Sequence, residues 1–217
     1  KEGASIIGGH TSKGKELTIG FTILGQTNKH PITIDGANQG DLIILTKPIG
    51  TGTILAGEMQ GLAKGLWIKN AQDWMMKSQG SIIKFLANKV TSMTDVTGFG
   101  LARHAQNLAM RVGAMGFTID LASLPLLGGV TRFFEAGITS SLHEQNQFAV
   151  TIDGEDQKHN NHSAILFDPQ TSGGLLGVFA AKDAENVVNA LVKTGHKAAV
   201  IGQLDQQFAG IKLVRGV

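Results

Sequence analysis

The residues from Thr94 to Leu101 (Thr-Asp-Val-Thr-Gly-Phe-Gly-Leu) could carry chemistry. Asp95 comes at the end of an expected strand, and a glycine-flanked turn then opens an expected helix. A carboxylate in this place could hold Mg²⁺, which prefers oxygen ligands and keeps phosphates attached. The helix N-terminus adds N–H donors and a positive dipole end for an anion. The alternative is that Asp95 only caps the turn, as Asp residues commonly do.

A second candidate is the segment Gly8-Gly9-His10-Thr11, which follows a short apolar stretch, residues 4–7, interpreted as a strand. Paired glycines let a backbone approach a ligand such as a nucleotide closely. His10 and Thr11 could donate hydrogen bonds to a phosphate. A plain turn explains the same residues.

Two further loops have defined shapes but a weaker chemical signal. Residues 168–174 (Asp-Pro-Gln-Thr-Ser-Gly-Gly) could line a site or simply join two strands. Residues 47–52 (Lys-Pro-Ile-Gly-Thr-Gly) lack the full pattern of a phosphate-binding loop and are interpreted as structural. His104 is interpreted as a packing or capping residue, and the polar segment 153–163 as a surface loop.

Hydrophobic periodicity predicts the elements that position these loops. Strands and helices interleave, which indicates an α+β fold in which a sheet and helices form layers. Residues 17–24 alternate as in a half-buried strand, and 41–46 form an apolar run typical of a strand covered on both faces. The other expected strands are 90–94, 115–121, 164–167, 174–180, 197–204 and 210–214, and the expected helices are 53–66, 69–89, 97–112, 129–136 and 182–193.

Composition limits the classes of function. The 217 residues carry a net charge of +2 without a Lys/Arg cluster, so nucleic-acid binding has little electrostatic support. No apolar run reaches the roughly 18 residues of a membrane span. The absence of cysteine excludes disulfides and thiolate metal sites and fits a reducing compartment, so we expect a cytoplasmic location. Because the first residue is Lys1 rather than Met, we interpret the chain as part of a longer protein.

Four motifs in order resemble one family: Gly-Gly-His-Thr, Lys-Pro-Ile-Gly-Thr-Gly, Met-Thr-Asp-Val-Thr-Gly-Phe-Gly-Leu, and Asp-Pro-Gln-Thr-Ser-Gly-Gly-Leu-Leu. Together they resemble selenophosphate synthetase (selenide, water dikinase), of the aminoimidazole-ribonucleotide-synthetase-like ATP-binding superfamily. The resemblance covers essentially the whole chain. It implies the conversion of ATP, selenide and water to selenophosphate, AMP and orthophosphate, with Mg²⁺ and often K⁺. It also implies a homodimer with two domains in each subunit.

The resemblance assigns roles to particular residues. Residues 1–36 would be a remnant of the N-terminal, β-rich ATP-binding domain, and 37–217 the C-terminal domain. Gly8, Gly9, His10 and Thr11 would lie against ATP, and Asp95 would be a Mg²⁺ ligand. Strand 17–24 would belong to the family's dimer sheet.

The sequence departs from the family pattern in ways that matter for activity. The family's selenium-handling Cys or selenocysteine, its nearby Lys and its other Asp metal ligands would lie upstream of Lys1. No catalytic residue is therefore assigned in this chain, and the chain alone is expected to be inactive. Residues 140–146 resemble versions fused to a flavin-dependent pyridine-nucleotide oxidoreductase. The alternatives are a non-catalytic dimerisation or docking domain of such a fusion and a sister ATP-using enzyme of the same superfamily.

Overall fold

The computed structural model describes residues 3–28, 30–111, 116–153, 163–205 and 210–214. The chain separates into two compact units, Lys1–Pro31 and Ile32–Val217. The predicted domains, 1–36 and 37–217, stay a prediction.

The described residues of the first unit contain no helix or strand, so the predicted strands 4–7 and 17–24 are wrong for this structure. The side chains that alternate along 17–24 are largely exposed; Leu17 is 100% and Phe21 79% exposed. A strand needs a neighbour to accept its backbone hydrogen bonds. An alternating pattern identifies a face that suits a sheet, but it does not supply the partner strand.

The second unit is built on a sheet of seven strands among the described residues, in the order β2-β5-β1-β6-β3-β7-β4. All pairs are antiparallel except β3–β7 and β4–β7, which are parallel. The strands are β1 (Leu42–Leu45), β2 (Val90–Asp95), β3 (Gly116–Asp120), β4 (Ile152–Asp153), β5 (Leu175–Phe179), β6 (Ala199–Asp205) and β7 (Gly210–Val214).

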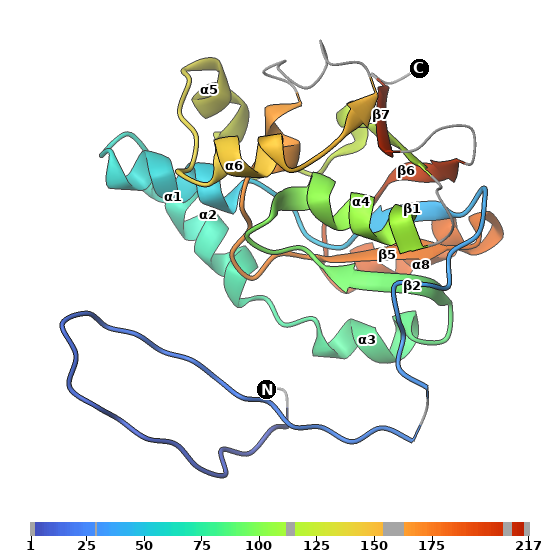
Figure 1. Ribbon diagram of the computed structural model, residues 1–217, viewed down its shortest axis with the longest axis horizontal. Coiled ribbons are helices and arrows are strands. Elements are labelled where there is room, and N and C mark those ends of the chain that lie inside the picture. The colour runs from blue at the N-terminus through green and yellow to red at the C-terminus, as the bar shows by residue number, and fades with distance from the viewer. Residues whose placement is uncertain (1–2, 29, 112–115, 154–162, 206–209, 215–217) are drawn as a thin grey trace. The chain divides into compact units, whose positions relative to one another are not determined.

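Helices cover both faces of this sheet (Figure 1). One face packs, with α1, α4 and α5, into the larger hydrophobic cluster, and the other packs against α3 and α8. The helices are α1 (Thr51–Met59), α2 (Gly65–Met76), α3 (Gly80–Leu86), α4 (Gly100–Arg111), α5 (Val130–Glu135), α6 (His143–Phe148) and α8 (Ala181–Lys193), with 3₁₀ turns η1 (Leu121–Ser123) and η2 (Ala164–Phe167). The α+β layered prediction is confirmed.

Strand β1 shows why the continuous apolar run was informative. Ile43 and Leu45 enter the larger cluster and Ile44 enters the other, and all three are fully buried. The run was apolar at successive positions because helices cover both faces of the sheet at this strand.

Several predicted elements differ from the structure. The predicted helix 53–66 begins earlier, at Thr51, and ends at Met59, since Gly61 adopts a φ of +72°. A new helix, α2, begins at Gly65. The predicted helix 69–89 is broken between Met76 and Gly80. The predicted strand 164–167 is the 3₁₀ turn η2, because a four-residue apolar run fits either conformation. Val112 and most of the 153–163 segment lie outside the described residues.

Candidate functional site

Three of the motif loops meet at one edge of the sheet. Strand β5 lies between β1 and β2 and is antiparallel to both, so its first residue lies beside their last ones. Leu175 pairs with Asp95 at the end of β2, and Leu176 pairs with Leu45 at the end of β1. The loop 168–174, which precedes β5, is thereby brought to the loops 47–52 and 95–100.

Gln170 ties these loops together. Its side-chain oxygen accepts from the Gly50 N–H at 3.0 Å, from the Thr51 N–H at 3.3 Å and from the Thr51 hydroxyl at 3.2 Å. Its own backbone N–H donates to the Thr97 carbonyl at 3.1 Å. One residue of the 168–174 loop therefore fixes both the start of α1 and the turn that follows Asp95.

Asp168 is a fully buried carboxyl in the same network. Thr53 donates its hydroxyl to Oδ1 at 2.7 Å, and Gln170 donates its amide to Oδ2 at 2.9 Å. Burial raises the pKa of Asp168 to about 7, although the hydrogen bonds from Thr53, Gln170 and Gly52 oppose the rise. Glycine is needed at position 52, because a Cβ there would lie 2.9 Å from Oδ1 and 2.6 Å from the Pro169 carbonyl oxygen.

The turn after Asp95 begins at the protein surface. Asp95 is exposed, while the next residue, Val96, is buried and donates its N–H to the Gly174 carbonyl at 2.9 Å. Gly100 has a φ of +77°, and a Cβ there would meet the Leu166 carbonyl oxygen at 2.8 Å. The two requirements together select glycine at the first residue of α4.

His104 caps this turn, as its sequence position suggested. Its Nε2 accepts the Thr97 N–H at 3.1 Å and lies 3.1 Å from the Thr97 hydroxyl. Burial lowers the pKa of His104, and the charge of Asp95 partly opposes this. The helix expected over 97–112 begins only at Gly100, so Thr97 precedes it.

Asn146 is a structural residue of the site that sequence reasoning missed. Its amide donates to the Gly98 carbonyl at 2.8 Å and to the Phe167 carbonyl at 3.0 Å. It lies on helix α6, which was not predicted because its sequence, His-Glu-Gln-Asn-Gln-Phe, has no apolar period. Asn146 therefore connects the glycine turn after Asp95 to η2.

The predicted metal and nucleotide residues remain predictions. The part of the chain that the structure describes contains no cluster of three or more His, Cys, Asp or Glu that could hold a metal ion. Exposed Asp95 fits one ligand of a Mg²⁺ ion, which takes about six oxygens. Gly8, Gly9, His10 and Thr11 are exposed in the first unit, and a Cβ added at Gly8 or Gly9 would meet no atom within 4 Å.

Comparison with known protein families agrees with this arrangement. Residues 38–211 match the family model described as AIR synthase related protein, C-terminal domain. The chain belongs to this family. The matched range of the AIR synthase related domain includes the sheet edge with its three motif loops.

Curated relatives of this AIR synthase related chain include proteins named selenide, water dikinase. It is 33% identical over 209 residues to a selenide, water dikinase of Geobacter sp. (strain M21), covering 94% of this chain and 59% of the relative. It is 32% identical over 216 residues to the selenide, water dikinase of Bdellovibrio bacteriovorus, covering 93% of this chain and 59% of the relative. The chain thus spans about 59% of the length of these relatives.

Solved structures show the same fold at low sequence identity. The hydrogenase maturation protein HypE of E. coli matches with a TM-score of 0.62 and 20% identity, over 86% of this chain and 50% of that one. Thiamine-monophosphate kinase from Stenotrophomonas maltophilia matches with a TM-score of 0.61 and 15% identity, over 84% and 52%. Among the described residues, no helix combines the length and apolar character required to span a membrane.

Proposed function

We propose that this chain is the C-terminal part of a selenide, water dikinase, which makes selenophosphate, AMP and orthophosphate from ATP, selenide and water. The observation that carries the proposal is that relatives 32–33% identical over 93–94% of this chain bear that name. The four motifs support it, because they occur in the order typical of that family.

The proposal gives this chain a share in holding ATP. Gly8, Gly9, His10 and Thr11 would lie against the nucleotide, and Asp95 would supply an oxygen ligand to Mg²⁺, with K⁺ as a further ion. Mg²⁺ offsets the negative charge of the phosphates when it is bound. ATP use is supported by the fold, since a HypE structure that matches with a TM-score of 0.57 was solved in complex with ATP.

The chemical step would depend on residues outside this chain. The chain spans 59% of the first listed relatives' length, and none of its residues matches the family's selenium-handling Cys or selenocysteine and Lys. We therefore propose that the active unit is a longer protein, a cytoplasmic homodimer, and that the 217-residue chain alone makes no selenophosphate.

The test is ³¹P NMR of the longer protein with Mg-ATP and selenide, run beside the 217-residue chain. The longer protein should form selenophosphate, AMP and orthophosphate, and the chain alone should form none of them. Asp95→Ala in the longer protein should remove most activity, whereas Asp73→Ala, an exposed carboxylate of α2, should not.

Each other outcome contradicts a stated part of the proposal. ATP left intact in the presence of selenide would refute the dikinase function and favour a dimerisation or docking domain. Consumption of ATP only with a different acceptor would indicate a sister enzyme of the superfamily. Turnover by the 217-residue chain would show that the catalytic residues lie within it.

A further inference from the structure

Gly98 differs from Gly100, the other glycine of the turn after Asp95. Gly100 requires the absence of a side chain, because its φ is positive and the Leu166 carbonyl oxygen lies close by. Gly98 has neither reason to be glycine, since its φ lies outside the left-handed region and an added Cβ would meet no atom within 4 Å. The fold itself would therefore accept a side chain at position 98. Glycine in such a place is typical of a backbone that a ligand approaches closely.

Asn146 holds the carbonyl group of this glycine. It is 6% exposed, and its amide nitrogen, Nδ2, donates to the Gly98 carbonyl at 2.8 Å and to the Phe167 carbonyl at 3.0 Å. An amide nitrogen has two N–H donors, and both are used here. The carbonyl of Gly98 is thus bound by a buried side chain, whereas the position of its missing side chain faces open space.

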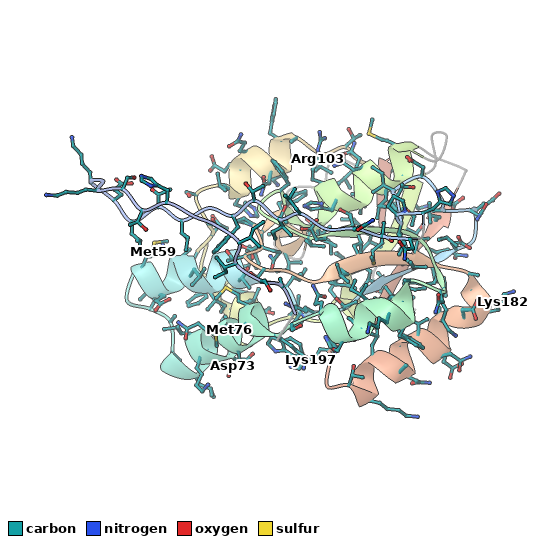
Figure 2. All side chains as sticks on the ribbon, turned by 90° about the horizontal axis from the view of Figure 1, so that it is seen from below. Met59, Asp73, Met76, Arg103, Lys182 and Lys197 are labelled. Atoms are coloured by element: carbon teal, nitrogen blue, oxygen red, sulfur yellow. The ribbon has the colours of Figure 1, made fainter. Side chains whose placement is uncertain are left out.

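Helix α6, which carries Asn146, has attachments of its own. Arg103 of α4, labelled in Figure 2, donates from its guanidinium to the carbonyl of Ala149, the C-cap of α6, at 2.9 Å. At the other end of α6, the His143 ring packs edge-on against the Phe167 ring, with 5.9 Å between the two centroids. These contacts hold α6 in place independently of Asn146, so a substitution of Asn146 should act mainly on the turn.

The residue before Gly98 is held from two further directions. The Thr97 N–H donates to His104 of α4 at 3.1 Å, and the Thr97 carbonyl accepts from the Gln170 N–H at 3.1 Å. The turn is therefore tied to α4, to α6 and to the loop 168–174, although Asp95 at its start is exposed. A binding segment that is fixed before its ligand arrives loses less conformational entropy on binding.

We propose that Asn146 is a positioning residue of the nucleotide site, which holds Gly98 where its open side lies against Mg-ATP. The inference rests on the proposed function, in which Asp95, earlier in the same turn, supplies an oxygen ligand to Mg²⁺. Gly98 is the contact residue, and its lack of a side chain makes room for the nucleotide. Asn146 touches no reacting atom and acts through the Gly98 carbonyl.

The first test adds a methyl group at the open side of Gly98. In the longer protein, Gly98→Ala should weaken the binding of Mg-AMPPCP, a non-hydrolysable ATP analogue, about tenfold or more in calorimetry, because the Cβ takes the ligand's place. Urea unfolding should show no loss of stability, because φ and the open space both allow alanine. Gly65→Ala, whose Cβ also meets no atom within 4 Å, is the control and should bind as the wild type does.

The second test removes the hydrogen bonds of Asn146 and restores one of them by pH. Asn146→Asp keeps the shape of the side chain, but an ionised carboxylate cannot donate and repels both carbonyl oxygens. At about pH 8 it should bind Mg-AMPPCP about tenfold more weakly than the wild type. At about pH 5 the deficit should shrink, because the protonated carboxyl regains one donor, whereas the deficit of Asn146→Ala should stay constant.

Asn107→Asp is the matched control, since Asn107 is an exposed residue of α4. Its affinity relative to the wild type should be the same at both pH values. A merely structural role of Asn146 would lower the free energy of unfolding of Asn146→Asp and leave the affinity of the folded protein unchanged. That result would overturn the proposal.

Backbone NMR of the 217-residue chain, without any nucleotide, tests the positioning by itself. The amides of Gly98 and Gly100 should be as ordered as those of α8 in the wild type, and Asn146→Ala should lower the order of Gly98 alone. Unchanged order at Gly98 would refute the role of Asn146.

The binding experiments separate this inference from the proposed function. A longer wild-type protein that does not bind Mg-AMPPCP would overturn the proposed function together with the contact at Gly98. Normal wild-type binding that neither Gly98→Ala nor Asn146→Asp weakens would overturn this inference alone.

Discussion

Asp168 offers a direct measurement of how strongly the loop network is desolvated. We consider Asp168→Asn, which keeps the shape of the side chain and removes its titration. The asparagine oxygen can accept the hydrogen bonds that Thr53 and Gly52 donate, and the Gln170 amide keeps its hydrogen bond to the carbonyl of residue 168. The variant should therefore fold and differ from the wild type mainly in its response to pH.

The size and sign of the effect follow from the raised pKa. A pKa near 7 in the folded state, against 3.8 for an ordinary Asp, means that the folded protein holds this proton more tightly than the unfolded chain. The stabilisation from this difference is complete below the ordinary value and is lost as the pH rises to about 7. Between pH 5 and pH 8 the wild type should lose about 2.6 kcal/mol of unfolding free energy relative to Asp168→Asn.

The assay is urea unfolding followed by circular dichroism at pH 5, 6, 7 and 8, with both proteins in the same buffers. Other titrating groups are common to the two proteins, so the difference between their unfolding free energies isolates Asp168. Asp35→Asn, a change at an exposed carboxylate, is the control and should follow the wild type at every pH.

A difference that does not change with pH would refute the reasoning that burial governs this carboxyl. A difference of opposite sign, in which the wild type gains stability as the pH rises, would also identify the cause. It would mean that the hydrogen bonds donated by Thr53, Gln170 and the Gly52 backbone outweigh desolvation and keep the carboxylate charged.

Three further predictions concern stability, and urea unfolding measures each of them. Gly129→Ala should lower the free energy of unfolding by about 2 kcal/mol or more, because φ is +94° and the added Cβ would lie 2.4 Å from the Trp67 ring. The control, Gly65→Ala, should not lower it, because a Cβ at Gly65 would meet no atom within 4 Å. Gln170→Ala should cost about 2–4 kcal/mol, because it leaves two buried backbone N–H groups without their acceptor. Asp73→Asn should cost less than about 0.5 kcal/mol, since its ion pair is exposed, and a larger loss would contradict this.

The sequence predicted well those elements whose spacing of apolar residues matches the side that is buried. Helix α8 was predicted over 182–193 from its apolar period, and Val187 and Leu191 are indeed buried. The turn after Asp95 was recognised from its glycines, and the structure gives the reason at Gly100, where positive φ and close backbone contact coincide.

The elements that sequence missed depend on contacts between distant residues. Asn146 shows no pattern in its own helix, and its importance follows only from the two carbonyls it reaches, 48 and 21 residues away. The strand prediction for residues 17–24 failed for the opposite reason: the alternation is present, but no strand of the described residues pairs with this segment.

The loop 168–174 was open to two interpretations, and its hydrogen bonds favour the structural one. The side chains of Asp168 and Gln170 are directed at the neighbouring loop and at each other, so little of their capacity remains for a ligand. Exposed Asp95 and Phe99, in contrast, lie in the turn that this network holds in place. The network therefore serves to hold the turn in place. As the proposed Mg²⁺ ligand, Asp95 would need further oxygen ligands from elsewhere, which is why Asp95→Ala must be assayed in the longer protein.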